Sequence, residues 1–412
     1  MGSRTQEAGP LGRDALGQLV MHLHLMGGSA TRAELTERLD CGRSVMGYLL
    51  GELTERGLVT VDRGARRGTG EGGRPSHLVR IAERAPVVIA AQLSPDAVSV
   101  ATVGLGAAVL DRHEVRLPSR RPEDALADLC APIAERLRGG RPVLGIGLAV
   151  PSPVRRSDGY APAALHLDWP AVPLRDLVLD HLRAHHGITG VPLALANDAN
   201  LAAMAESRHG AGRGATQLLY LMTGNVGLGG AVISEGRLFA GARGYAMEPG
   251  HITVDPAGAA CPCGSTGCLE VEADHRGLLR LAGRGEVPLD AVTTTVADVL
   301  RAAENGDPAA WQAVRQANRN LGIGLAGLIN LTDPDRIVLG GTLGRMHRLQ
   351  PEAVHATVAE RSFLSPLGDI PISPGDLTDG VLLGAAELAL QPLLDDPRRT
   401  LATLPLTDPP TA

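Results

Sequence analysis

Lysine is absent from the 412 residues, so all 39 basic side chains are arginines, and aromatic residues make up only 2% of the chain. So few aromatics argue against a base-stacking surface for single-stranded nucleic acid. Hydrophobic residues make up 44%, which allows sizeable cores in the two or three domains that this length suggests. No apolar run approaches the ~18–20 residues that cross a bilayer, and residues 1–10 lack the apolar stretch of a signal peptide. We therefore expect a cytoplasmic protein with no membrane partner.

Cysteine is also scarce, and its five copies do not suggest a disulfide framework. Cys261, Cys263 and Cys268 fall within eight residues, and His251 lies ten residues upstream. Three thiolates and one imidazole suit the tetrahedral coordination of Zn²⁺ in a structural site. The pattern therefore predicts that these four residues bind one structural zinc ion. An iron–sulfur cluster and a set of free thiols are the alternatives.

The N-terminal part of the chain differs from the rest in charge. Residues 56–80 hold six arginines and two acidic residues, although the whole chain carries a net charge of −6. The apolar periodicity, the glycine stops and the β-prone runs predict three helices and then two strands, over 14–26, 31–39, 43–56, 58–62 and 78–81. This order is typical of a winged helix-turn-helix, which we assign to residues 1–82.

In a winged helix-turn-helix, the third helix enters the major groove of double-stranded DNA. Its face opposite the leucines carries the candidates for base contact, namely Arg43, Ser44, Gly47 and Tyr48. Arginines of the wing are expected to reach phosphates or a minor groove, namely Arg63, Arg66, Arg67 and Arg74. The alternative is a three-helix protein-interaction module with a solvated, charged loop.

From residue 87 onward, predicted strands alternate with helices, which favours an α/β architecture with functional residues at the carboxyl ends of strands. The expected strands are 87–92, 97–103, 107–116, 143–150, 191–196, 218–222, 230–233 and 334–339. Helices are expected over 123–138, from about 200 to 207, and over 380–390. We divide this body into an N-terminal lobe (83–196), a C-terminal lobe (197–380) and a closing helix with a flexible tail (381–412).

Several segments of the body are similar to signatures of the ROK family of repressors, open reading frames and sugar kinases. They are Asn197-Asp198-Ala199-Asn200, Gly236–Gly244, Glu248-Pro249-Gly250-His251, the C-x-C-G-x-x-G-C-x-E run Cys261–Glu270, and Arg336–Gly341. The similarity spans about residues 85–392, and with the N-terminal module the whole chain resembles ROK transcriptional regulators. The resemblance implies a two-lobed, actin-like and sugar-kinase-like α/β body. Such a regulator is expected to bind a pseudo-palindromic operator as a homodimer or a dimer of dimers.

The same resemblance implies a site for a sugar or phosphosugar effector. Its hydroxyls would be hydrogen-bonded by Asn197, Asp198, Glu248, His251 and Glu270. His251 would then bind zinc through one ring nitrogen and face the sugar with the other, coupling the two sites. The alternative is that Asp198 only caps the following helix and Glu248 is a loop charge. One departure is His166, which stands about where many members have a sugar-contacting asparagine.

The nucleotide site of the family's kinases is altered here. Their D-x-G-x-T hairpin corresponds to Gln92-Leu93-Ser94-Pro95-Asp96, and their glycine-rich phosphate loop to Gly224–Gly230, with Val226 where backbone would approach phosphate. Asp198 remains where the kinase general base would lie. Because phosphoryl transfer depends on positioning and charge neutralisation, we expect a sugar-responsive transcriptional regulator, a repressor, without kinase activity. An active ATP-dependent sugar kinase with a DNA-binding head is the first alternative. A regulator that answers to a protein partner or to its own concentration is the second.

Overall fold

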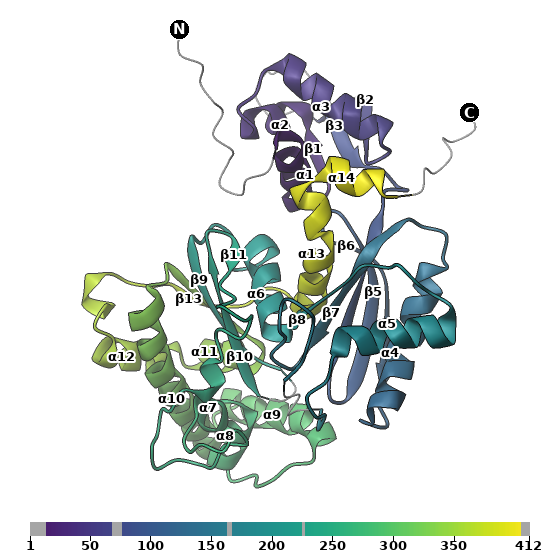
Figure 1. Cartoon of the computed structure of the whole chain (residues 1–412). Helices are drawn as coiled ribbons and strands as arrows, with labels where there is room; N and C mark the ends of the chain where they lie inside the picture. Colours follow the sequence, from purple (N-terminus) through teal and green to yellow (C-terminus); the bar gives the residue numbers. More distant parts are fainter. Residues whose placement is uncertain (1–13, 68–75, 163–166, 225–226, 405–412) are drawn as a thin grey trace.

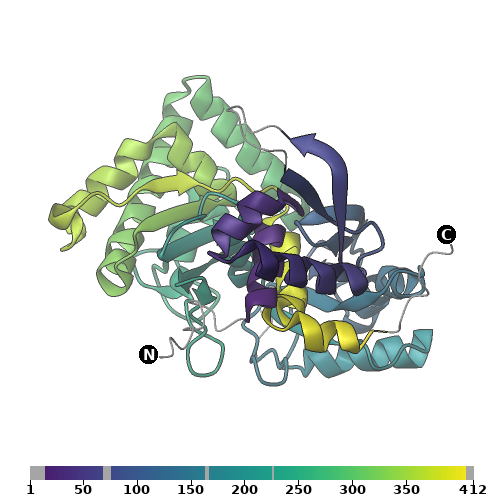
Figure 2. The ribbon, with the colours of Figure 1, turned by 90° about the horizontal axis from the view of Figure 1, so that it is seen from above.

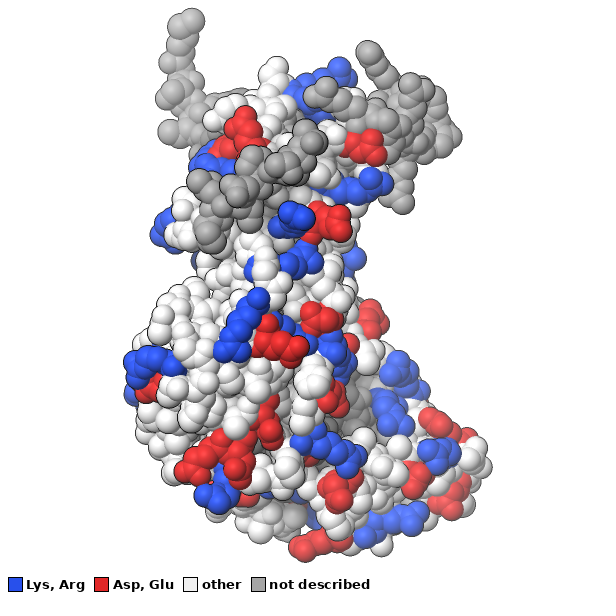
Figure 3. Space-filling view, turned by 90° about the vertical axis from the view of Figure 1, so that its right-hand side faces the viewer, with Lys and Arg blue, Asp and Glu red and all other residues white. Residues whose placement is uncertain are grey.

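The computed structural model describes residues 14–67, 76–162, 167–224 and 227–404, and the side chains of these ranges except 63–67. It consists of a small N-terminal head above a body of two lobes (Figure 1). The molecule narrows between head and body, and basic and acidic side chains are interspersed over the face of the body in Figure 3.

The head has the predicted helices and ribbon. Its elements are α1 (Ala15–Leu25), β1 (Ser29–Thr31), α2 (Arg32–Arg38), α3 (Arg43–Glu55), β2 (Val59–Arg67) and β3 (Ser76–Ile81), and the sheet order is β1-β3-β2. Thr31 and Glu34 form a capping box at the start of α2, in which the side chain of each residue accepts a hydrogen bond from the backbone N–H of the other. The sequence did not predict β1, because three residues are too few to show a strand period.

Both lobes are built on five-stranded sheets with the same plan. The first sheet has the order β6-β5-β4-β7-β8 and the second the order β11-β10-β9-β12-β13. In each, an antiparallel run of three strands is followed by two parallel strands. The strands are β4 (Val87–Leu93), β5 (Ala97–Gly104), β6 (Ala108–Arg116), β7 (Val143–Val150), β8 (Leu193–Asn197), β9 (Gln217–Thr223), β10 (Leu228–Ser234), β11 (Arg237–Leu238), β12 (Arg336–Gly340) and β13 (Ile372–Pro374). The expected two-lobed α/β architecture is therefore confirmed.

The centre of the first sheet is covered on both faces, so β4 is apolar from Val87 to Ala91, whereas the edge strand β6 is exposed. Along β4, Ile89 and Ala91 pack toward α4 (Pro122–Leu137) and α5 (Leu174–His186). The alternate residues Val88 and Ala90 pack in the core that contains α13 (Gly380–Asp395). This period-two division is that of a central strand between two helical layers.

The second sheet is covered by α6 (Asp198–His209) on one side. Ala202 and Ala203 of α6 pack in one core with Tyr220, Ala231 and Val338 of the sheet. The remaining helices of this lobe are α7 (Leu269–Ala273), α8 (His275–Leu281), α9 (Leu289–Glu304), α10 (Pro308–Thr332), α11 (Gly341–Leu349) and α12 (Pro351–Arg361). None of these six helices was predicted from the sequence.

The C-terminal helices return from the second lobe to the first and reach the head. Helix α13 lies against the first sheet, and the head sits over it in the view from above (Figure 2). Residues 397–402 form a further helix, α14, where the sequence analysis expected a flexible tail. Its start is capped by Asp396, whose side chain accepts from the N–H of Arg399. A helix of six residues is too short to show a helical periodicity in the sequence, so it was not predicted. Within the described ranges, no helix combines the length and apolar character needed to cross a membrane.

Candidate functional site

A small cavity between the lobes gathers all five residues that the family resemblance assigned to a sugar. It has a volume of about 160 Å³. Its lining includes Ser152, Gly227, Asn197, Asp198, Glu248, His251 and Glu270. These residues come from both lobes and from segments more than a hundred residues apart, so only the tertiary structure brings them together.

The start of α6 shapes part of this cavity. Asn197 is the residue that caps α6: its Oδ1 accepts from the N–H groups of Ala199 at 2.9 Å and Asn200 at 3.2 Å. Asp198 is already the first residue of the helix, and its Oδ1 accepts from the Ala199 N–H at 2.8 Å. Burial raises the pKa of Asp198 to about 6. The capping role that was the alternative for Asp198 therefore belongs mainly to its neighbour.

Two glutamates also line the cavity. Partial burial, with the negative charges of Asp198 and Glu270, raises the pKa of Glu248 to about 7. Glu270 is almost fully buried, and its Oε2 accepts from the N–H of Leu228 at 3.2 Å. Its Oε1 accepts from Arg276 at 2.6 Å, so this carboxylate is held rigidly before any ligand binds. Arg276 was not predicted from the sequence, since nothing in its spacing from Glu270 marks the pair.

The predicted metal ligands form one cluster beside the cavity. A ring nitrogen of His251 and the three sulfurs of Cys261, Cys263 and Cys268 all lie within 4.8 Å of one another. A tight hairpin aligns the sulfurs, in which Cys261 N–H donates to Ser265 C=O at 2.8 Å. At Gly267 (φ +63°) a Cβ would lie 1.4 Å from the Asp255 carbonyl oxygen, so only glycine fits. One nitrogen and three sulfurs at this spacing can hold a metal ion.

A larger cavity of about 480 Å³ adjoins the first and shares Pro151, Asp198, Met222 and Gly224 with it. Here lie the residues that replace the kinase hairpin: Gln92, Ser94 and Pro95 all line it. Gln92 Nε2 donates to Ser94 Oγ at 3.2 Å, so an amide stands where a kinase has a carboxylate. The predicted departures at Val226 and His166 lie outside the described residues.

The proposed DNA-reading helix presents its predicted face to solvent. Arg43, Ser44 and Tyr48 of α3 are exposed, and Tyr48 is 69% accessible. Gly47 differs from the expectation, because the Arg32 guanidinium covers it and would lie 3.0 Å from an added Cβ. The exposed Val45 was missed. Of the wing arginines, Arg63, Arg66 and Arg67 belong to β2, but their side chains, and all of Arg74, lie outside the described part.

Comparison with known proteins decides the family. Residues 89–392 match the sequence profile of the ROK family. The chain belongs to the ROK family. It is 27% identical over 382 residues to a putative xylose repressor of Caldicellulosiruptor sp. strain Rt8B.4, covering 89% of this chain and 93% of the relative.

Two solved structures show how much of its fold this ROK protein shares with a regulator and with a kinase. A ROK family transcriptional regulator, a homologue of the Escherichia coli Mlc protein, superimposes with a TM-score of 0.72 at 24% identity and covers 93% of this chain and 98% of its own. A ROK family glucokinase from Streptomyces griseus, solved with glucose and AMPPNP, has a TM-score of 0.63 at 29% identity. The glucokinase covers 74% of this chain but 99% of its own length. The regulator therefore shares nearly the whole architecture, whereas the kinase matches only part of it.

Proposed function

We propose that this ROK protein is a DNA-binding transcriptional repressor of the cytoplasm whose body binds a sugar or sugar phosphate and transfers no phosphate. The observation that carries the proposal is a contrast between two adjoining cavities. The smaller keeps its full set of hydroxyl-binding side chains, whereas the larger has Gln92, Ser94 and Pro95 in place of the kinase hairpin. Full-length similarity to a putative xylose repressor supports the same reading.

DNA recognition is assigned to the head. The exposed side chains of Arg43, Ser44 and Tyr48 suit base edges in the major groove. The wing residues Arg63, Arg66, Arg67 and Arg74 would supply phosphate contacts. A homodimer would place two heads on the half-sites of a pseudo-palindrome, because a two-fold protein matches a two-fold operator.

Sugar binding is assigned to the smaller cavity. Vicinal hydroxyls would be gripped by Asn197, Asp198, Glu248, His251 and Glu270. Carboxylates are strong acceptors for such hydroxyls, and hydrogen bonds to charged groups are worth about 1.5–3 kcal/mol each.

Zinc is assigned to the cluster of His251, Cys261, Cys263 and Cys268. The soft sulfur-rich donor set fits a closed structural Zn²⁺ site, and its binding free energy would contribute to folding. The Nδ1 of His251 faces the sulfurs while the residue lines the sugar cavity, so the metal would fix the ring that meets the sugar.

Two measurements test the function. Full-length protein would be used to select a duplex from a random-sequence library, and affinity for that duplex would be measured with and without D-xylose, D-glucose and their phosphates. We expect sequence-selective binding that one of these sugars shifts. The proposal is contradicted if the protein selects no DNA sequence, or if none of these sugars changes its affinity for DNA.

A sugar kinase is the second candidate, because Asp198 lines both cavities and its pKa is raised to about 6, within the working range of a general base. Steady ADP release from ATP with one of the same sugars, abolished by Asp198→Asn, would establish it. We expect no such turnover.

A further inference from the structure

A buried carboxylate joins the head to both lobes. Glu387 of α13 is 1% exposed. Its Oε1 contacts the Nε2 of His24, from α1 of the head, at 2.7 Å and the Nε2 of His209, from the end of α6, at 2.8 Å. Its Oε2 is paired with Arg208, the residue before His209. One side chain thus connects three helices that belong to three different parts of the molecule.

The hydrogen bonds around His24 define which ring nitrogen carries the proton. Its Nδ1 accepts from the N–H of Gly106 at 2.9 Å, so the proton of a neutral ring is on Nε2, which donates to Glu387. Although His24, His209 and Glu387 offer ligand atoms within 4.8 Å of one another, a protonated Nε2 cannot bind a metal ion. Arg208 supplies the charge that balances the buried carboxylate. The cluster is therefore a hydrogen-bonded ion pair.

Helix α6 runs from the sugar cavity to this junction. Asn197 and Asp198 at its start line the cavity, and Arg208 and His209 at its end contact Glu387. At ~1.5 Å per residue the helix spans roughly 18 Å. A helix is stiff over this length, so a displacement at one end is carried to the other.

The contact between α6 and α13 is unusually close. A Cβ at Gly384 of α13 would lie 1.9 Å from the carbonyl oxygen of Leu201 in α6. Since α6 packs on the second sheet and α13 on the first, this crossing is where the two lobes meet. Movement of one lobe against the other must therefore be absorbed at or beside this contact.

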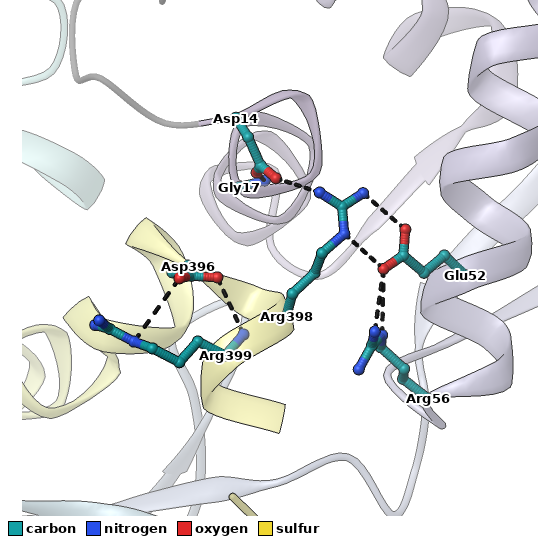
Figure 4. A network of polar contacts seen from close by, with 7 residues as sticks. All are labelled: Asp14, Gly17, Glu52, Arg56, Asp396, Arg398 and Arg399. Atoms are coloured by element: carbon teal, nitrogen blue, oxygen red, sulfur yellow. Dashed lines mark hydrogen bonds and ion pairs between the residues drawn. The ribbon is translucent and has the colours of Figure 1, made fainter. Parts of the chain in front are cut away.

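The head is held on the C-terminal helices at both ends of α1. His24, near the end of α1, bonds Glu387, while Asp14, which caps its start, is paired with Arg398 of α14 at 2.5 Å (Figure 4). Arg398 also donates to both carboxylate oxygens of Glu52 in α3 at 2.8 Å. A shift of α13 and α14 would consequently carry α1 and the DNA-reading helix with it.

We propose that Glu387 transmits sugar occupancy to the DNA-binding head. This inference rests on the proposed function for the existence of a sugar response. A sugar in the cavity would contact Ser152, which follows β7 of the first sheet, on one side and Glu248 and Glu270 of the second lobe on the other, and closing on it moves α6 relative to α13. Because His24 and His209 share a single oxygen of Glu387, that movement alters the hold on α1. The sugar would then bind the two head arrangements with different affinity, which is the requirement for a response.

The mechanical link is tested first, without sugar or DNA. Amide hydrogen exchange would be followed in full-length wild type, Glu387→Gln, His209→Gln and the control Glu360→Gln, whose glutamate is exposed on α12. We expect exchange in residues 15–25 to accelerate by about five-fold or more in the first two variants and to change by less than about two-fold in the control. His209→Gln keeps the experiment decisive if the buried variant fails to fold. Unchanged exchange in α1 of both variants would overturn the link.

The transmission is tested next with the selected duplex and the same sugars, D-xylose, D-glucose and their phosphates. In wild type we expect sugar to change DNA affinity by about ten-fold, within the usual range of coupling between sites. In Glu387→Gln the change should fall below about two-fold while sugar affinity, measured by calorimetry, stays within about two-fold. A full response in Glu387→Gln overturns this inference alone, whereas absence of any response in wild type overturns the proposed function as well. A metal ion that is lost in His24→Gln and kept in Cys263→Ser would overturn the assignment of the junction as an ion pair.

Discussion

The Nδ1 of His251 lies 3.8 Å from the Sγ of Cys261, while the same histidine lines the cavity that holds Asp198 and Glu248. The metal cluster and the sugar cavity thus share a side chain. A change at the cluster should reach the sugar, although the cysteines do not line the cavity themselves.

Cys263→Ser should release the metal and destabilise the second lobe. Removing one of four ligands forfeits binding free energy that contributes to folding, and loss of a structural metal costs roughly 4 kcal/mol or more. Metal content by elemental analysis and the midpoint of thermal unfolding would check this. Cys41→Ser is the matched control, because Cys41 lies in the head, outside the cluster. Wild type with well under one zinc per chain contradicts the assignment.

Asp198→Asn should weaken sugar binding by roughly ten- to a hundred-fold, because a charged hydrogen-bond partner worth about 1.5–3 kcal/mol is lost. DNA affinity without sugar should be unchanged, since Asp198 lies in the body. Calorimetry with the responsive sugar and DNA binding by the apo protein are the two measurements. Equal sugar affinity in both proteins would place the ligand elsewhere.

The same substitution should stabilise the sugar-free protein at alkaline pH. Folding raises the pKa of Asp198 from 3.8 to about 6, so above pH 6 the native state keeps a carboxylate charged at a cost of about 1–3 kcal/mol. The cost shrinks as the pH falls through 6 and vanishes below 3.8, where both states are protonated. Asparagine keeps the oxygen that accepts from Ala199. Urea unfolding at pH 8 should therefore favour Asp198→Asn, and an advantage that persists unchanged at pH 4 would contradict the cause.

Arg43→Ala should relax sequence preference, whereas Arg66→Ala should weaken binding to every duplex. A base contact discriminates by ~1–3 kcal/mol, while a phosphate contact acts through counterion release and lowers the salt slope by about one. Competition between the selected duplex and mismatched duplexes, over a range of salt, separates the two. Arg319→Ala, on the exposed side of α10, is the control. If the salt dependence of DNA binding is unchanged in Arg66→Ala, the wing does not contact phosphates.

Two helical glycines should respond oppositely to alanine. At Gly384 the new Cβ meets the Leu201 carbonyl oxygen at 1.9 Å, and such overpacking costs about 1–3 kcal/mol or more. At Gly327 in α10 nothing lies within 4 Å of the new Cβ, so Ala should stabilise by about 0.5–1 kcal/mol. Denaturant unfolding of both variants checks the signs. A neutral Gly384→Ala would mean that α6 and α13 separate easily.

Local sequence determined the head, the metal cluster and the family. Three amphipathic helices and a ribbon have periods that a single chain displays, and α1 to α3 fall within a few residues of the expected bounds. The four predicted metal ligands lie within eighteen residues, from His251 to Cys268, so a local hairpin is enough to bring them together. The signature around Asn197 and Asp198 likewise pointed to one cavity through family resemblance, and the sugar-binding role of this cavity stays a prediction.

Tertiary structure alone decided the partners that are distant in the chain. Arg276 pairs with Glu270 and the head bonds Glu387 across 363 residues, and no periodicity encodes either contact. Helix α14 is too short to show a helical periodicity in the sequence. The ion pair between Arg398 of α14 and Asp14 therefore depends on where the tertiary structure places this helix. A hydrophobic pattern specifies which face of an element is buried, whereas the neighbour that covers this face is selected by the packing of the whole chain.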